Sequence, residues 1–490
     1  MILGELQPLL SQAQLIGEET VEVTGIAYDS RLVKPGNLFC AIPGFRTDGH
    51  LYCADAAQRG AQSFLVERAE AIPAGFSGLV VKNAREAMAV AANQFFGVPS
   101  RRLMMVGVTG TNGKTTITHL IRYLLESENM PCGLTGTLHT LIGQDVYTVL
   151  HTTPEAPDLQ SLLRHMVDRG MQAAVMEVSS HALALRRVDK VEYDIAVFTN
   201  LTQDHLDFHP TFEDYFAAKA LLFQRLNESE KNGPHAALIN IDDAYGARMA
   251  QISTAPVLTY GINHPADMSA ENVRITPKGS QFVAHFPDQT TQVIDFPMTG
   301  RFNVSNALAA LLTGHVLGLR HDIMAQALAR YPGVPGRFER IDEGQPFTVI
   351  VDYAHTPDGF DNVLRTAKEF TAGAIGVVFG AGGDRDHGKR ALMGEMAAKW
   401  ADWIVLTADN PRSEDPIEII HQIVQGIEPF GTPYTVELDR KRAIGLALKK
   451  AKPGDVVLLL GKGHENYQIY RDGTIHFDDR EVARKILREI

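Results

Sequence analysis

The sequence of 490 residues has few cysteines, no long apolar run and no excess of positive charge. Its cysteines are three, an odd number with no CxxC pair, which supports neither a disulfide framework nor a zinc cluster and fits a reducing cytoplasm. Every uninterrupted apolar run, such as 456–460, is far shorter than the roughly 18 residues that a membrane span needs. The amino terminus has no cationic leader and carries Glu5 in its apolar stretch, which predicts an amphipathic helix and not a signal peptide.

Charge and composition narrow the class of protein further. Lys and Arg number 46 and Asp and Glu 58, and the net charge of −12 argues against broad binding to nucleic acid or to an anionic membrane. With 45% hydrophobic and 21% charged residues, a chain of this length predicts two or three globular domains, each with its own core. We therefore expect a cytoplasmic protein that binds neither nucleic acid nor membrane, and in which any anionic ligand meets a local positive site.

The distribution of strands predicts three domains. Short strands at 21–27 and 79–81 alternate with turn-rich stretches, which indicates a small α/β domain at the amino terminus. Further along, strands that are apolar on both faces alternate with helical patterns, which is typical of parallel sheets covered by helices. These strands are expected at 103–108, 173–178, 194–199, 348–351, 374–379, 403–407 and 455–460. The segment 331–336, with two prolines and two glycines, predicts a linker, so we place the domains at 1–98, 99–332 and 333–490.

A glycine-rich turn follows the first strand of the central domain. The strand 103–108 runs into Thr-Gly-Thr-Asn-Gly-Lys-Thr-Thr at 109–116, and an apolar stripe at the helical period comes next. Such a turn lets backbone N–H groups cradle phosphates, while Lys114 supplies charge and the Thr115 hydroxyl can bind Mg²⁺. The spacing GxxGKT is shorter than the generic GxxxxGKT, but a turn between a strand and a helix favours phosphate binding over a purely structural glycine turn.

Polar residues follow the next two strands as well. Glu177 ends the strand 173–178, and His205 lies in the segment 200–207 after the strand 194–199. Because the carboxyl ends of parallel strands meet at one edge, both residues are expected beside the phosphates. Either residue alone is more often a capping or hydrogen-bonding group; together they favour one or two Mg²⁺ sites, since a cation that bridges phosphates needs few protein ligands.

Lys219 falls in the middle of an apolar helical stripe within 212–223. A buried ammonium group is costly, so this lysine should be paired, neutral or chemically modified. The alternative is a lysine whose amine reaches the surface past its neighbours, and the pattern alone does not decide between the two.

These motifs, in this order, resemble those of the Mur ligases, the ATP-dependent amide-forming enzymes that build the peptide of bacterial cell-wall precursors. The resemblance covers nearly the whole chain and rests on the segments 110–116, 177–181, 200–205, 218–219, 300–306, 335–337 and 351–355. It implies an α/β fold of three domains: a small N-terminal uridine-binding domain, a central P-loop-type ATPase domain with a parallel sheet, and a C-terminal Rossmann-like doubly wound domain.

The same resemblance assigns roles to residues of the central domain. Lys114, Glu177, His205 and Lys219 would be catalytic, with Lys219 carbamylated and acting with Thr115, Glu177 and His205 on Mg²⁺. ATP would contact Gly110, Thr111, Asn112, Gly113, Lys114, Thr115, Thr116, Asn303, Asn306, Arg337 and Asp352. For Asn303 and Asn306 the alternative is that they only cap or pack a helix.

Substrate residues are implied in all three domains. The UDP-sugar-peptide would contact Tyr28, Ser30, Phe45, Arg46, Thr47, Thr152, Thr153, Ser179 and Arg187. The sequence departs from some members at His151 and Leu185. An amino acid would contact Arg385, Asp409, Asn410, Pro411, Arg412, Gly461 and Glu465, each placed after an apolar strand. Arginines can fork onto carboxylates and a glutamate can hold an ammonium group, and Asp-Asn-Pro-Arg at 409–412 is similar to the signature of members that add meso-diaminopimelate.

The implied reaction is the ATP- and Mg²⁺-dependent joining of meso-diaminopimelate to the D-Glu of UDP-MurNAc-L-Ala-D-Glu through an acyl phosphate, with release of ADP and phosphate. The implied partners are therefore small molecules, and the sequence leaves the oligomeric state open, with a monomer plausible. Two alternatives stay open: a folate polyglutamate ligase, which resembles the central and last domains, and a nucleotide-driven switch whose output is conformational.

Overall fold

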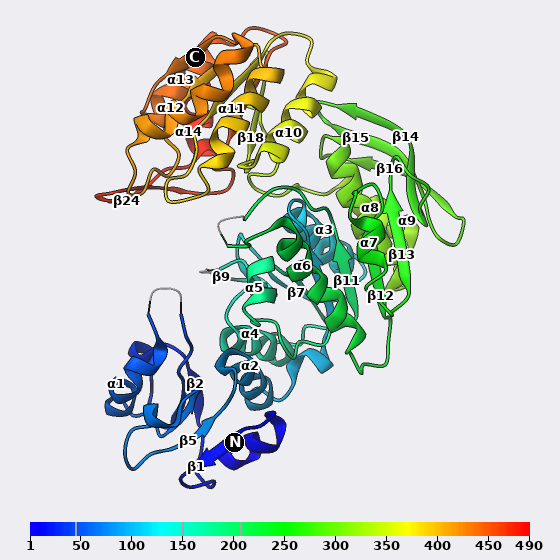
Figure 1. Ribbon diagram of the computed structural model, residues 1–490. Helices are drawn as coiled ribbons and strands as arrows, with labels where there is room; N and C mark the ends of the chain where they lie inside the picture. Colours follow the sequence, from blue (N-terminus) through cyan, green and yellow to red (C-terminus); the bar gives the residue numbers. More distant parts are fainter. Residues whose placement is uncertain (45–46, 149–150, 206–207) are drawn as a thin grey trace.

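The computed structural model describes residues 1–44, 47–148, 151–205 and 208–490. Three α/β units follow one another along the chain, in agreement with the predicted fold class (Figure 1). The boundaries predicted at 98/99 and 332/333 stay predictions. In the described ranges, no helix is long and apolar enough to cross a membrane.

The N-terminal unit contains a five-stranded sheet in the order β1-β5-β4-β3-β2, with β1 antiparallel and the others parallel. Its strands are β1 Gln14–Ile16, β2 Gly25–Ala27, β3 Asn37–Cys40, β4 Ser63–Val66 and β5 Ser77–Val80. Its α-helices are α1 Cys53–Gln58 and α2 Ala84–Phe95, and its 3-10 helices are η1 Leu3–Leu9, η2 Ser30–Leu32, η3 Gly49–Tyr52 and η4 Ala69–Ala71.

Two local predictions in this unit are wrong. The amino-terminal amphipathic helix is a 3-10 helix, η1, which contains Pro8 and ends at Leu9, because proline lacks the N–H that a longer helix would need. Of the strand expected at 21–27, only β2 at Gly25–Ala27 forms, since the residues before it make only an isolated bridge between Ile2 and Glu22.

The central unit contains an eleven-stranded sheet in the order β16-β15-β14-β13-β12-β11-β6-β10-β7-β8-β9. Its strands from β7 to β14 in that order pair in parallel, and antiparallel strands extend both edges. The strands are β6 Met104–Thr109, β7 Cys132–Thr135, β8 Thr140–Ile142, β9 Asp145–Tyr147, β10 Ala173–Glu177, β11 Ile195–Phe198, β12 Ala236–Asn240, β13 Val257–Gly261, β14 Met268–Thr276, β15 Gly279–His285 and β16 Thr291–Phe296.

Helices cover both faces of the parallel part of this sheet. Alternate strand residues enter two separate cores: Val106 packs with α3 and α8, whereas Met105 packs with α4 and α6. The elements outside the sheet are η5 Pro99–Arg102, α3 Lys114–Ser127, α4 Ala156–Asp168, α5 Ser180–Ala184, α6 Phe212–Asn227, α7 Gly246–Ala250, α8 Arg301–Val316 and α9 His321–Ala329. Burial on both faces explains why these strands have uniformly apolar sequences.

The C-terminal unit is doubly wound, as predicted. Its six-stranded sheet has the order β17-β18-β22-β19-β20-β21, parallel apart from β17, with α10 to α12 on one face and α13 and α14 on the other. Its strands are β17 Glu339–Ile341, β18 Thr348–Asp352, β19 Ile375–Phe379, β20 Trp403–Leu406, β21 Tyr434–Val436 and β22 Val456–Leu460, with a separate hairpin of β23 Tyr467–Tyr470 and β24 Gly473–His476. Its helices are α10 Pro357–Phe370, α11 Gly388–Trp400, α12 Pro416–Ile427, η6 Glu428–Phe430, α13 Arg440–Lys450 and α14 Asp479–Leu487.

Candidate active site

The turn after β6 requires glycine at two positions. Gly110 and Gly113 have φ angles of +149° and +88°, which side-chain-bearing residues rarely adopt. A Cβ atom on Gly110 would lie 1.8 Å from Thr199 Oγ1, and one on Gly113 would lie 2.6 Å from Asn306 Oδ1. The motif therefore sets the path of the backbone that leads into the N-terminus of α3, where free N–H groups favour an anion.

The segment after β11 holds this turn in place. Asn200 Oδ1 accepts a hydrogen bond from the Asn112 backbone N–H at 2.9 Å, and Thr199 Oγ1 donates to the Asn112 carbonyl at 2.6 Å. The Thr111 hydroxyl accepts from the Thr202 N–H at 3.0 Å. The turn is thus ordered by side chains of the neighbouring strand end before any ligand binds.

Two lysine amines meet at one carbonyl oxygen. Lys114 Nζ donates to Gly110 O at 2.9 Å and Lys219 Nζ donates to the same oxygen at 2.7 Å. Lys219 is 1% exposed, in the middle of α6, so the alternative of an amine that reaches the surface is excluded. Burial, reinforced by the charge of Lys114, lowers the pKa of Lys219 well below its usual value, and burial also lowers the pKa of Lys114.

Glu177 ends β10 with a fully buried carboxylate. Its Oε2 accepts from the Thr115 hydroxyl at 3.1 Å and from the Thr137 hydroxyl at 2.9 Å, and its Oε1 accepts from the Thr137 N–H at 2.8 Å. Thr137 was missed by sequence reasoning, because it follows β7 without any motif. The carboxylate and the Thr115 hydroxyl form a pair of hard oxygen donors, which suits Mg²⁺.

His205, in the segment after β11, has a left-handed backbone conformation, with φ of +57°. Its ring packs edge-on against His181 at 4.8 Å between centroids, and its Nε2 lies 3.3 Å from Asp204 Oδ2. Burial, with the neighbouring His181, Lys219 and Lys114, lowers the pKa of His205 although the charge of Asp204 opposes the shift, and this favours the neutral imidazole that a metal ligand requires.

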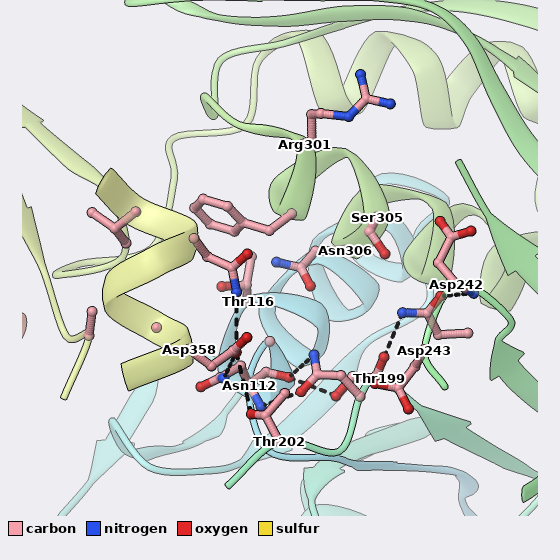
Figure 2. Close-up of a pocket in the computed structure, with 18 of the residues that line it drawn as sticks. Asn112, Thr116, Thr199, Thr202, Asp242, Asp243, Arg301, Ser305, Asn306 and Asp358 are labelled. Carbon is pink, nitrogen blue, oxygen red and sulfur yellow. Dashed lines mark hydrogen bonds between the residues drawn. The ribbon is translucent and has the colours of Figure 1, made fainter. Parts of the chain in front are cut away.

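A cavity of about 550 Å³ lies between the central and C-terminal units, and Figure 2 shows part of its lining. Of the residues predicted for ATP, the lining includes Asn112, Gly113, Thr116, Asn306, Arg337 and Asp352. Asn303 does not line the cavity: it is 1% exposed and its Oδ1 accepts from Asn306 Nδ2 at 3.2 Å. Asn303 therefore orients Asn306.

Arg337 and Asp352 reach the cavity from the C-terminal unit. Arg337 Nη2 donates to Thr115 Oγ1 at 3.0 Å and the guanidinium lies 4.6 Å from the centre of the Tyr353 ring. Asp352 accepts from the N–H groups of Phe338 and Ala354 at 2.6 and 2.7 Å, and burial raises its pKa. Arg337, directly after the predicted linker, thus reaches Thr115 at the start of α3.

Asp358 also joins the two units, and sequence reasoning missed it. Its Oδ2 accepts from Asn112 Nδ2 at 2.8 Å and from Thr202 Oγ1 at 3.3 Å (Figure 2). In the sequence, Asp358 looks like an ordinary acidic residue in the first turn of a helix, since Pro357 and the Thr356 cap precede it.

Four of the residues predicted for the sugar-peptide meet beside Glu177. Thr153 Oγ1 donates to Glu177 O at 2.9 Å and lies 3.3 Å from Ser179 Oγ, while Arg187 Nη1 donates to Thr153 O at 3.2 Å. Thr152 Oγ1 lies 3.2 Å from the Thr137 hydroxyl, completing the group.

The residues predicted in the N-terminal unit are less closely grouped. The Tyr28 hydroxyl donates to Asp158 on α4 at 2.5 Å; burial and that hydrogen bond raise the Tyr28 pKa, and this contact joins the first unit to the second. Ser30 is buried in η2, and the Thr47 hydroxyl lies 3.1 Å from the Tyr52 hydroxyl. Phe45 and Arg46 lie outside the described residues.

The predicted amino-acid residues converge at the strand ends of the C-terminal sheet. Asn410 Nδ2 donates to Glu465 Oε2 at 2.8 Å, and a Cβ on Gly461 would lie 2.7 Å from Asp409 Oδ2. Lys462, which sequence reasoning missed, is fully buried and donates to Glu465 Oε2 at 3.1 Å. Burial, together with the nearby charge of Asp409, raises the pKa of Glu465. A cation beside Asp409 and Glu465 would therefore be stabilised.

Arginines lie on the other side of the same rim. A Cβ on Gly382 would lie 3.0 Å from Arg412 Nη1 and 3.7 Å from Arg385 Cγ, so both side chains run past this glycine. Arg412 Nη1 donates to Gly383 O at 2.7 Å, and the Pro411 carbonyl lies within 1.9 Å of a Cβ on Gly383. The Tyr467 hydroxyl donates to Glu465 Oε1 at 3.4 Å.

Models of known protein families match most of the chain. Three family models match successive segments of it: "Mur ligase family, catalytic domain" at residues 22–105, "Mur ligase middle domain" at 108–314 and "Mur ligase, glutamate ligase domain" at 336–463. A relative from Caldanaerobacter subterraneus subsp. tengcongensis, named UDP-N-acetylmuramoyl-L-alanyl-D-glutamate--2,6-diaminopimelate ligase, is 46% identical over 97% of each chain. A relative of the same name from Solibacter usitatus is 44% identical over 100% of this chain and 98% of its own.

Solved structures give the same result. A structure titled UDP-N-acetylmuramoyl-L-alanyl-D-glutamate--2,6-diaminopimelate ligase is 33% identical, has a TM-score of 0.71, and the match covers 100% of this chain and 99% of that one. MurF from Acinetobacter baumannii is 19% identical with a TM-score of 0.67 over 99% and 98% of the two chains, which shows the shared fold. The fold and the matching relatives define an ATP-dependent α/β ligase, and the chain belongs to the Mur ligase family.

Proposed function

We propose that the protein is an ATP-dependent ligase that adds meso-2,6-diaminopimelate to the D-Glu of UDP-MurNAc-L-Ala-D-Glu during synthesis of peptidoglycan precursors. Relatives that share 43 to 46% of its residues over nearly the full length carry that activity in their names. The observation that carries the choice of amino acid is the C-terminal rim. There Arg385 and Arg412 lie beside Gly382, Asp409 lies beside Gly461, and the charge of Asp409 acts on Glu465.

The rim matches an amino acid with charged groups at both ends. The two guanidinium groups would bind carboxylates, and the two carboxylates would hold an ammonium group. Lys462 offsets one of the two negative charges, which leaves about one charge to be met by the ligand. L-lysine would offer the ammonium group but lacks the second carboxylate, so its binding would leave an arginine without its partner.

The nucleotide would occupy the cavity between the central and C-terminal units. The P-loop N–H groups and Lys114 would hold the phosphates, and the negative phosphates would restore the charged form of Lys114 that burial disfavours. Arg337 would add positive charge from the C-terminal unit, since its guanidinium already contacts Thr115. Charge neutralisation and positioning of this kind are the main sources of catalysis in phosphoryl transfer.

Mg²⁺ would be held by Thr115, Glu177, His205 and a carbamylated Lys219, and would supply charge neutralisation at the phosphates. The buried oxygens of Glu177 and Thr115 fit a hard cation. Carbamylation joins the neutral Lys219 amine to CO₂ with loss of a proton, and the lowered pKa of Lys219 favours that neutral amine. A mass increase of one CO₂ on Lys219 in protein kept in bicarbonate, absent from Lys219→Met, would test the modification.

The reaction would proceed in two displacements on the substrates. The free side-chain carboxylate of the D-Glu residue would attack the γ-phosphorus of ATP, forming an acyl phosphate and releasing ADP. The neutral amine of diaminopimelate would then attack the acyl carbon, lose its proton and expel phosphate. Thr152, Thr153, Ser179 and Arg187 would position the peptide end beside Glu177, because they already meet there.

Release of phosphate from ATP tests this proposal. It should require Mg²⁺, UDP-MurNAc-L-Ala-D-Glu and meso-diaminopimelate together, and replacement of the amino acid by L-lysine or buffer should abolish it. Turnover that ignores the amino acid would instead support a nucleotide-driven switch, and turnover with L-glutamate and a folate would support a folate polyglutamate ligase.

A further inference from the structure

Three side chains with metal-binding chemistry meet at the far end of α8 from the nucleotide. Asp288 lies between β15 and β16, His315 in the last turn of α8, and His321 is the first residue of α9. One ligand atom of each lies within 4.8 Å of those of the other two. Asn306, which lines the nucleotide cavity, is nine residues earlier on α8, which corresponds to roughly 14 Å along the helix. The cluster is therefore distinct from the proposed catalytic site.

Hydrogen bonds determine which nitrogen of His321 is available. The Thr290 hydroxyl donates its single proton to Asp288 Oδ1 at 2.7 Å. The same hydroxyl lies 2.9 Å from His321 Nδ1, so it accepts a proton from that nitrogen. His321 thus carries its proton on Nδ1 and directs the lone pair of Nε2 toward His315 Nδ1, at 3.0 Å.

This arrangement has the features of a metal ligand and its support. Metal-binding histidines donate their other N–H to an oxygen acceptor that is itself hydrogen-bonded, and the chain from His321 through Thr290 to Asp288 does so. Phe286 stacks on the His321 ring at 3.7 Å with an interplanar angle of 13°, which restricts the ring. Both hydrogen bonds from Thr290 to Asp288 go to Oδ1, so Oδ2 has no bond to Thr290.

The distance between the two nitrogens is close to that of two ligands on one ion. Zn–N bonds of about 2.0–2.1 Å at a tetrahedral angle place two nitrogens roughly 3.3 Å apart. His315 would need only to move its proton from Nδ1 to Nε2, which leaves the imidazole neutral.

We propose that Asp288, His315 and His321 form a site for a divalent transition-metal cation of the Zn²⁺ type, completed by solvent, that fastens the β15–β16 turn to the corner between α8 and α9. Two imidazoles and one carboxylate suit Zn²⁺, Ni²⁺ or Co²⁺, whereas Mg²⁺ and Ca²⁺ prefer oxygen ligands throughout.

Zinc binding to the full-length protein tests the site. Calorimetric titration with ZnCl₂, in the presence of excess Mg²⁺ and ADP, should find one more Zn²⁺ per chain in the wild type than in His321→Ala. Asp288→Asn, which changes only an exposed side chain, should weaken this binding at least about tenfold. His476→Ala removes an exposed histidine elsewhere and should bind zinc like the wild type.

Stability and activity give the second readout. Zn²⁺ should raise the melting temperature of the wild type and of His476→Ala but not that of His321→Ala or Asp288→Asn. Ligase activity with Mg²⁺ and ATP should stay within about twofold of the wild type in all variants, since the cluster lies away from the cavity. Equal zinc stoichiometry and affinity in the wild type and both cluster variants would overturn the site, and site-dependent binding without a melting shift would overturn its fastening role.

Discussion

Removal of the Asp358 carboxylate should weaken use of ATP, because this side chain joins the C-terminal unit to the glycine-rich turn after β6. Asn112 Nδ2 and Thr202 Oγ1 donate to one oxygen, Oδ2, at 2.8 and 3.3 Å. A hydrogen bond to a charged acceptor contributes about 1.5–3 kcal/mol, and we assign this value to the shorter contact alone. The expected loss in kcat/KM for ATP in Asp358→Ala is therefore about 10- to 150-fold.

The assay is steady-state phosphate release at varied ATP with both other substrates saturating. Asp358→Asn keeps an acceptor oxygen but loses the charge, so it should fall between the wild type and Asp358→Ala. Lys368→Ala, on an exposed position of the same helix, serves as the control and should behave like the wild type. A kcat/KM for ATP within twofold of the wild type in folded Asp358→Ala would refute the role of this contact between the units.

Three further variants test separate parts of the account. Gly113→Ala should weaken ADP binding at least about tenfold in a calorimetric titration. The new Cβ would lie 2.6 Å from Asn306 Oδ1, and the φ of +88° alone costs an alanine about 1–2 kcal/mol. Unchanged affinity for ADP would contradict this prediction. Glu465→Gln should raise the KM for diaminopimelate about tenfold or more and leave the KM for ATP unchanged, and equal changes in both would argue against ammonium binding. Glu414→Gln should lower the urea midpoint at pH 7, because the buried Arg390 loses its bidentate partner. The hydrogen bond from Arg390 lowers the Glu414 pKa to about 2, so this contribution is complete above about pH 4.5 and is lost as pH falls toward 2; a gap between the variant and the wild type that persists at pH 2 would be inconsistent with it.

The parts of the fold that sequence predicted are those with local signals. The parallel strands β6, β10 and β11 lie within a residue or two of their expected positions, because burial on both faces makes them uniformly apolar. The antiparallel strands β8 and β9 are three residues each, and β9, at the edge of the sheet, is mostly exposed, so they have no comparable pattern. The helix expected at the amino terminus is a short 3-10 helix that contains Pro8, and the spacing of its apolar residues does not show this effect of proline.

In the candidate site too, the residues with local sequence signals were predicted and those that depend on distant partners were not. Glycines and Lys114 were predictable because the turn encodes its own backbone path, and the burial of Lys219 follows from its place in an apolar stripe. Asp358 was not, because its partner Asn112 lies 246 residues away in sequence. Lys462 was not either, because besides Glu465 it donates to Asn410, which lies 52 residues away. Contacts of that range arise from how the sheets are placed, which the sequence pattern around either residue does not contain.

Selectivity between two amino acids tests the central claim most directly. The measurement is kcat/KM for meso-diaminopimelate and for L-lysine, in the wild type and in Arg412→Ala, with the ligated product identified by mass. The account predicts that the wild type prefers diaminopimelate by at least about 100-fold, and that Arg412→Ala loses most of this preference through slower use of diaminopimelate. Equal use of the two amino acids by the wild type, or an unchanged preference in Arg412→Ala, would contradict it.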